Sequence, residues 1–440
     1  MKNYTIRKDN LHTICYKLSR EIAFFCTCFI IYKLCLQEDF IRIVLTSILY
    51  LMFYITSIKY EKKKKIITIG YIFIFIILFI NNSICSAYYT EQTVNRLNGI
   101  HGFWAKDYFF IYFCVTIISY CFILLYLYLI RQNEKNENCY QSFQNKNSLY
   151  TIFATLFFAL LYKFNIFQDA IIPVYSFLLA GILFSKKRFI FIINFIMIFA
   201  VTGLQVFKIR FMVLQIIFPL MLLFLYCNKR KRSISFIFAN LLMLLGCLAV
   251  CFYGVISEVI KLNTFWGGNY RILDSISSAN IFFNGSLRQF YRLFGIWIKT
   301  GGYIIYHVQE VNRDFFYGLT YIKFLANIVN IPYINLPMIS AIYNLSIYAQ
   351  PGLLAEGYAN FGIVGSITNI CLAFFLCEFF SKQYIRKHSF TYLFISIVPF
   401  SKILLDGGTI NSAIIILIFC IILFAPELFR IKSQYFKYNE

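Results

Sequence analysis

Charged residues are scarce in this chain, and acidic residues are fewer than basic ones. Only 14% of its 440 residues are charged, with 19 Asp+Glu against 41 Lys+Arg, whereas a soluble domain usually carries about 25% charge. Apolar residues make up 60% of the chain and aromatic residues 20%. One water-soluble core cannot bury so much apolar surface. The composition therefore excludes an ordinary soluble domain.

Several familiar motifs are also missing. The sequence has no Walker A loop, no G-x-S-x-G elbow and no H-E-x-x-H zinc motif, so ATP-driven and hydrolytic functions have no support. Most of its 14 cysteines lie inside apolar runs, where Cys behaves as a small hydrophobe. Their spacing fits neither a metal site nor a disulfide framework. No metal or other cofactor is expected.

Long, nearly uncharged apolar runs recur along the chain, and about 20 residues span a bilayer. The basic residues lie in short clusters between these runs and not on a soluble domain, which excludes a nucleic-acid binder. The sequence predicts an all-α polytopic membrane protein with twelve transmembrane helices. The predicted spans are 22–36, 40–58, 66–87, 108–130, 149–165, 170–184, 189–204, 211–226, 234–257, 357–380, 389–404 and 410–425.

The distribution of basic residues predicts the orientation. With the N-terminus inside, the inside segments carry 26 of the 41 Lys+Arg, and the longer outside segments carry 11. The positive-inside rule therefore places both termini in the cytoplasm. Most of the net charge of +22 then reflects topology and contact with membrane lipids.

The long segment between the last two groups of spans breaks the pattern. We expect an N-terminal bundle of about nine spans (1–257), an extracytoplasmic cap (258–356) and a C-terminal group of three spans (357–440). A loop this long in a compact protein is usually functional or disordered. Its aliphatic and aromatic content argues against disorder, so we expect the cap to be folded.

Within the cap, residues 285–300 predict an amphipathic helix. Arg288, Arg292 and Lys299 fall within about 40° of one another on a helical projection. Such a basic stripe could bind a phosphate or pyrophosphate, because the planar guanidinium of Arg bonds phosphate oxygens in pairs. The alternative is an interfacial helix whose cations reach lipid headgroups.

Two further charged residues stand out. Arg210 lies at the outer start of a predicted span, against the positive-inside trend; it either extends to headgroups or faces an internal cavity. Glu356 lies where the cap returns to the membrane, as a candidate general base, a partner for an arginine, or a solvated surface residue. The nearby Gly357 and Gly365 suit close helix packing. His307 could act as an acid or base, but lone histidines in polar loops are usually solvated.

The residues around the end of the cap resemble those of the Wzy-type O-antigen polymerases, which polymerise oligosaccharide repeat units. The resemblance rests on the segments 318–337 and 351–367 and on Arg210. The matching positions are Gly318, Tyr321, Ile331, Pro332, Glu356, Tyr358, Asn360, Phe361, Gly362 and Gly365. The family architecture is similar as well, with about a dozen spans, both ends inside and one large late periplasmic loop.

The resemblance implies a C-type glycosyltransferase-like architecture in a bacterial inner membrane. It implies transfer of a growing glycan from undecaprenyl pyrophosphate to the next lipid-linked repeat unit in O-antigen biosynthesis. A chain-length regulator and a flippase are the partners that it suggests. Its expected catalytic residues are Arg210, Arg288, Arg292 and Glu356. Its expected substrate-binding residues are Arg271, Lys299, Tyr358 and Asn360.

Three other assignments stay open from the residues alone: a flippase, a ligase, and a structural or regulatory membrane protein with no active site. A lipid-linked oligosaccharide flippase would show repeat symmetry between halves, and no internal repeat is visible here. An O-antigen ligase would use the same chemistry with a different acceptor, and only the resemblance around 318–337 favours a polymerase over it.

Overall fold

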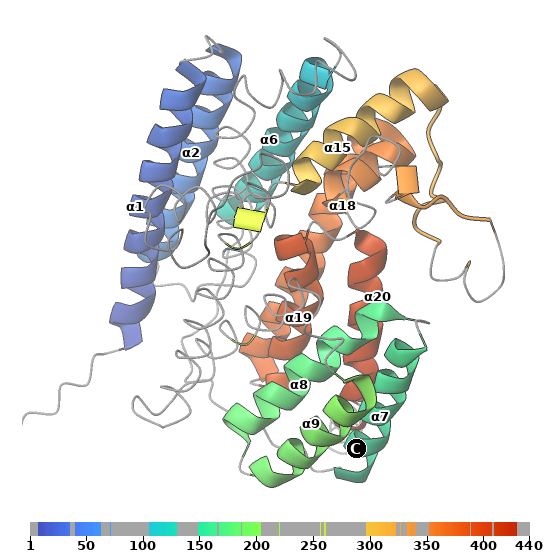
Figure 1. Cartoon of the computed structure of the whole chain (residues 1–440). Helices are drawn as coiled ribbons and strands as arrows, with labels where there is room; N and C mark the ends of the chain where they lie inside the picture. Colours follow the sequence, from blue (N-terminus) through green and yellow to red (C-terminus); the bar gives the residue numbers. More distant parts are fainter. Residues whose placement is uncertain are drawn as a thin grey trace, which may run out of the picture. The chain divides into compact units, whose positions relative to one another are not determined.

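The computed structural model (Figure 1) places only part of the chain well enough to describe. The described ranges are 8–35, 40–62, 105–129, 148–164, 167–185, 187–203, 296–322, 332–336, 352–387, 389–406 and 409–428, with the single residues 71, 220, 256, 259, 260, 326, 338 and 339. Every secondary-structure element in these ranges is a helix. The predicted all-α class is confirmed for this part of the chain.

The helices follow the apolar runs closely. In chain order they are α1 (Lys8–Cys35), α2 (Phe40–Lys62), α6 (Ala105–Leu129), α7 (Ser148–Lys163), α8 (Ile171–Phe184), α9 (Arg188–Thr202), α15 (Ile296–Tyr306), α18 (Gly352–Lys387), α19 (Phe390–Asp406) and α20 (Ile410–Leu423). A 3-10 turn, η2 (Gln168–Ala170), precedes α8, and a π-helix, η3 (His307–Asn312), follows α15. Basic residues occupy the last turns of α2 and α18, where they complement the negative end of the helix dipole.

Within the described part of the chain, three helices are long and apolar enough to cross a membrane: Phe40–Lys62, Phe110–Leu129 and Gly352–Lys387. Helices α7, α8, α9, α19 and α20 are apolar but shorter. The predicted spans at 66–87, 211–226 and 234–257 fall almost entirely outside the described residues. The other predicted spans coincide in position with described helices, so the sequence located these helices correctly.

The chain forms two compact units. The first contains α1, α2, α6, α15, η3, most of α18 and the first residue of α20. The second contains α7, α8, α9, α19 and the rest of α20. In the second unit, the rings of Phe177, Phe394 and Phe424 pack edge to face at centroid distances of 5.2–6.3 Å. Such packing is the favoured arrangement of aromatic rings in a core.

In the first unit, α1 and α2 form an antiparallel pair, and the end of α2 lies beside the end of α6 (Figure 1). The Tyr60 hydroxyl donates a hydrogen bond to the Leu127 carbonyl at 3.2 Å, and the Lys59 ammonium donates to the Tyr128 carbonyl. These contacts satisfy carbonyls in the last turn of α6, which have no partner within the helix. Helix α15 also packs on α6.

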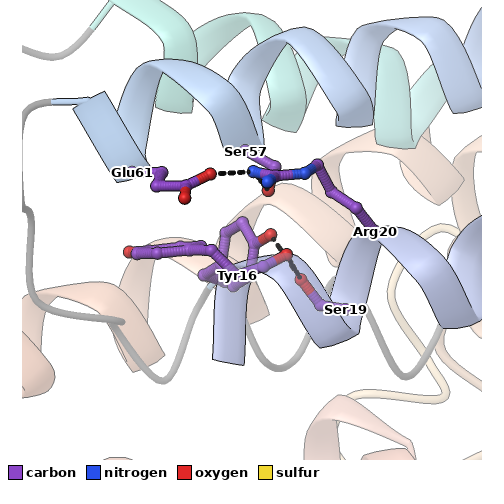
Figure 2. Close-up of polar contacts among 6 residues, drawn as sticks. Tyr16, Ser19, Arg20, Ser57 and Glu61 are labelled. Atoms are coloured by element: carbon purple, nitrogen blue, oxygen red, sulfur yellow. Dashed lines mark hydrogen bonds and ion pairs between the residues drawn. The ribbon is translucent and has the colours of Figure 1, made fainter. Parts of the chain in front are cut away.

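A polar cluster joins α1 to α2 at the same end of the pair. Figure 2 shows the Arg20 guanidinium directed at Glu61, with an N–O distance of 2.5 Å, and at Ser57, 3.4 Å away. Ser19 lies beside it and shares a hydrogen bond of 3.1 Å with the Tyr71 hydroxyl. The side chains of Arg20 and Glu61 are mostly shielded from solvent. We therefore interpret the cluster as a structural contact that holds α1 and α2 together.

Candidate functional site

Helix α18 is two helical limbs that reverse direction. Its backbone leaves helical geometry at Phe361 (φ −144°, ψ 24°) and Gly362 (φ 62°, ψ −147°). The Asn369 side-chain amide then donates a hydrogen bond of 3.1 Å to the carbonyl of Leu353, although a straight helix would separate these residues by about 24 Å. We call residues 352–360 the first limb and residues 363–387 the second limb. The predicted span 357–380 therefore starts too early, because the backbone turns back at 361–362 and only the second limb continues through the rest of it.

Glycines make this reversal possible. The sequence predicted that Gly357 and Gly365 would allow close packing of helices. The backbones of Gly357 and Gly365 touch where the limbs cross, and a Cβ on Gly365 would overlap the Gly357 carbonyl. The Ser366 hydroxyl donates to the Leu354 carbonyl at 2.7 Å across the same contact. At the turn, Gly362 takes a positive φ that other residues rarely adopt. The two limbs thus form a closely packed helical hairpin.

Glu356 points inward from the first limb. Its side chain is only 1% exposed, so the interpretation of a solvated surface residue is wrong. Its carboxylate accepts a hydrogen bond of 2.6 Å from the backbone N–H of Ile410, the first residue of α20. A carboxylate at this place satisfies an N–H group of the helix start and complements the positive end of its dipole. Glu356 therefore fastens the first limb to the start of α20.

Asn360 binds the first limb to the end of the predicted cap. Its buried amide nitrogen donates to the Thr320 hydroxyl at 2.6 Å and to the Glu356 carbonyl at 2.7 Å. Its amide oxygen accepts a bond of 2.8 Å from the backbone N–H of Gly318. One side chain thus uses both donors and its acceptor to hold two segments that are 40 residues apart.

Other contacts fix the same two segments together. The Phe316 N–H donates to the Ala359 carbonyl at 2.8 Å, and the Tyr321 hydroxyl donates to the Asn369 side chain at 2.8 Å. Burial, and secondarily the Glu356 carboxylate, raise the pKa of Tyr321 to about 12. The phenol therefore stays protonated and remains a donor at physiological pH. We call residues 313–322, the first limb and Asn369 together the hairpin cluster.

The segment that enters the cluster carries unusual backbone geometry. Helix α15 continues into η3, a π-helix, which is a rare element that is frequent at functional sites. Arg313 then takes a left-handed conformation (φ 56°, ψ 20°), and Tyr317 also has a positive φ of 47°. Each such residue other than glycine costs of order 1–3 kcal/mol. The hydrogen bonds from Phe316 and Gly318 to the first limb keep the backbone in these strained conformations.

The surroundings of His307 and Tyr317 shift the pKa values of both side chains. Burial lowers the pKa of His307, in the first turn of η3, so the imidazole is neutral at pH 7 and is not simply solvated as its sequence context suggests. The Asp314 carboxylate accepts hydrogen bonds from the Tyr317 hydroxyl at 2.7 Å and from the Phe315 N–H at 2.8 Å. The bond from Tyr317 raises the pKa of that phenol.

The structure brings together some of the predicted site residues. Glu356, Tyr358 and Asn360 share the first limb, and Tyr358 accepts a hydrogen bond from the Gln309 amide. Lys299 lies in α15, but its side chain is outside what the structure describes. The predicted catalytic and substrate-binding arginines at 210, 271, 288 and 292 also lie outside the described residues. Among the groups that are described, no cluster of His, Cys, Asp and Glu could hold a metal ion.

Sequence reasoning missed several members of the cluster. Thr320 and Asn369, and Gln309 beside the cluster, are ordinary polar residues with no distinctive spacing. The hydrogen bond from the Ile410 N–H to Glu356 involves a backbone group, which no sequence motif reveals. The sequence signal for the turn was Gly362, because glycine adopts the positive φ of a turn without steric cost.

The described helices and the hairpin cluster define a helical protein with helices able to cross a membrane. The chain belongs to a family of unknown function, DUF6032, whose sequence profile matches residues 22–437. The match covers nearly the whole chain, including both limbs of the hairpin. No curated protein and no solved structure matches the chain.

Proposed function

We propose that the protein polymerises lipid-linked oligosaccharide repeat units at the outer face of a bacterial inner membrane, as an O-antigen polymerase. The proposal includes twelve spans, cytoplasmic termini and a C-type glycosyltransferase-like architecture. The donor is a growing glycan on undecaprenyl pyrophosphate. The acceptor is the next repeat unit on its own lipid carrier.

One observation supports this proposal most. The resemblance to the polymerases rests on two segments separated in sequence, and residues of both meet in the hairpin cluster. Gly318 is hydrogen-bonded to Asn360, and the rings of Tyr321 and Phe361 lie 6.4 Å apart. Residues that serve one site are expected to converge in this way, whereas a chance likeness of two segments predicts no contact between them.

The chemistry requires a cationic site and a proton acceptor. The bond between the anomeric carbon of the donor glycan and the diphosphate oxygen breaks, and the diphosphate leaves with the bonding electrons. The acceptor hydroxyl oxygen forms the new glycosidic bond and loses its proton. Arg210, Arg288 and Arg292 would stabilise the developing charge on the diphosphate, at roughly 1.5–3 kcal/mol for each charge-assisted hydrogen bond. Arg271, Lys299, Tyr358 and Asn360 would hold the substrates.

Glu356 enters the proposal in one of two roles. As a general base, it would accept the proton of the acceptor hydroxyl, which requires access to a side chain that is 1% exposed in this structure. As a positioning residue, it would act through the start of α20, to which it is hydrogen-bonded. Glutamine at position 356 separates the roles, because its amide oxygen can accept the Ile410 N–H bond but the group cannot take up a proton.

The function is tested by glycan profiling of a host that lacks the gene. Lipopolysaccharide from the deletion strain is compared on gels with that of strains carrying the wild-type gene, Arg210→Ala, Glu356→Gln or Glu356→Ala. Lys163→Ala, at an exposed cation in the last turn of α7, is the matched control. Membrane abundance of each variant is measured by immunoblot.

A polymerase predicts single repeat units on the core in the deletion strain and a ladder restored by the wild-type gene and by Lys163→Ala. A normally abundant Arg210→Ala without a ladder would support the cationic site. A deletion strain with no capped core at all would contradict a polymerase and indicate a flippase or a ligase. A ladder from Glu356→Gln but not from Glu356→Ala would assign Glu356 to positioning.

A further inference from the structure

We infer that the exposed loop formed by residues 313–317 binds a diphosphate-linked sugar, with Arg313 on the diphosphate and Tyr317 on the sugar. The inference rests on the proposed function and names a substrate contact for it that the sequence did not predict. None of these loop residues belongs to the arginine stripe expected at 285–300. Three features of the loop favour such a ligand: its strained backbone, its side chains and its anchorage on the first limb.

The strain is the first feature. Arg313 follows the last turn of η3 in a left-handed conformation, a position that glycine usually occupies at helix ends. Tyr317 repeats the anomaly four residues later, and for a bulky residue a positive φ is a true outlier. Glycine or asparagine would form the same backbone more easily. Two large side chains at strained positions indicate that the side chains themselves are needed.

The side chains are the second feature. Arg313 is exposed, and no described residue pairs with its guanidinium. Tyr317 is 65% exposed, yet its hydroxyl is held by Asp314 at 2.7 Å. The ring is therefore fixed in orientation with apolar surface open to a ligand. A guanidinium suits phosphate oxygens, and an aromatic face suits the C–H face of a sugar.

The anchorage is the third feature. Phe316, between the two strained residues, is buried and bonded to the Ala359 carbonyl. The Phe315 ring contacts the Tyr358 ring at a centroid distance of 6.2 Å. The loop is thus held on the first limb at Tyr358 and Ala359. Ligand contacts on a backbone already fixed in place lose little freedom on binding.

Binding to defined probes tests the inference without any glycan assay. The purified full-length protein is placed in nanodiscs of phosphatidylcholine and titrated, by microscale thermophoresis, with farnesyl diphosphate and with farnesyl-diphosphate-linked N-acetylglucosamine. The variants are Arg313→Gly, Arg313→Lys and Tyr317→Gly, with Lys163→Ala as the control. Glycine is chosen because it suits both backbone conformations. Arg313→Gly removes only the side chain, whereas Tyr317→Gly also removes the hydrogen bond to Asp314.

We expect Arg313→Gly to weaken both probes by roughly tenfold or more, the effect of losing a charge-assisted hydrogen bond, and Arg313→Lys to weaken them less. Tyr317→Gly should weaken only the glycosylated probe, by roughly fivefold. Lys163→Ala should change neither affinity. The thermal unfolding temperature of the glycine variants should equal or exceed that of the wild type, because glycine relieves the strained backbone.

Equal affinities for wild type and Arg313→Gly would overturn the inference, as would a lower unfolding temperature for that variant, which would make Arg313 structural. The titration is repeated in discs containing phosphatidylglycerol. Loss of the Arg313-dependent affinity there would assign the loop to lipid headgroups and also overturn the inference. Probe binding that depends on Arg313, in a protein that restores no glycan ladder, would uphold the site and refute the polymerase.

Discussion

Replacing Gly357 by alanine should have opposite effects on stability in a straight helix and in the helical hairpin. In a continuous α-helix, Gly→Ala stabilises by roughly 0.5–1 kcal/mol, because alanine has less backbone freedom to lose. In the hairpin, a Cβ at position 357 would lie 2.3 Å from the Gly365 carbonyl oxygen and 2.6 Å from the Ser366 Cα. Both atoms belong to the backbone, so no side chain can rotate away.

The loss of stability in Gly357→Ala can be estimated from the movement that the added Cβ forces on the two limbs. The limbs have to separate by about 1 Å, and overpacking of this kind costs roughly 1–3 kcal/mol. The bonds from Ser366 to Leu354 and from Asn369 to Leu353 would lengthen, at about 1 kcal/mol each. After subtracting the gain in helix propensity, we expect Gly357→Ala to lower the free energy of unfolding by roughly 2–4 kcal/mol.

The assay is unfolding of the purified protein in detergent, followed by circular dichroism. Val364→Ala is the control, because Val364 lies in the second limb and is 72% exposed; its effect should stay within about 0.5 kcal/mol. An unchanged or increased stability for Gly357→Ala would refute the reversal of α18 and with it the hairpin cluster.

Three further changes test the polar contacts. Asn360→Ala should lower the free energy of unfolding by roughly 2–4 kcal/mol in the same assay, because it leaves the Gly318 N–H buried without its acceptor; an effect below 1 kcal/mol would contradict this. Arg20→Ala should cost roughly 1–3 kcal/mol, since it strands Glu61, and Arg20→Lys less; equal losses would count against the ion pair. Because burial lowers the pKa of His307, the unfolded chain binds more protons, so stability should fall as pH drops below about 6.5. His307→Gln should flatten that dependence in melts recorded across pH, and an unchanged slope would exclude His307 as its cause.

The sequence was sufficient to place most helices, because a run of apolar residues is itself the physical cause of a membrane helix. It did not predict the break in α18. The sequence predicts one continuous span at 357–380, and glycines such as Gly357, Gly362 and Gly365 are frequent in membrane helices generally. Contacts between the two limbs decide that Gly362 turns the chain and that Gly357 and Gly365 form the close contact where the limbs cross. The local sequence does not contain that information.

The candidate site was predicted in part. The resemblance selected Gly318, Tyr321 and Asn360, and these residues do lie in one hydrogen-bonded cluster. The general-base interpretation of Glu356 considered its charge and position but not its partner, which is a backbone N–H in a helix that begins 54 residues later. Arg313 and Tyr317 were not singled out, because positive φ angles are a property of the folded backbone.

The bond between Glu356 and the start of α20 also bears on how the protein is made. The ribosome adds the 54 residues between them in roughly 3–10 s. Until then the first limb lacks the helix start that receives its carboxylate. Synthesis of the start of α20 therefore completes the candidate site. Chains that stall or are truncated before residue 410 would present Glu356 to the insertion and quality-control machinery without its α20 partner.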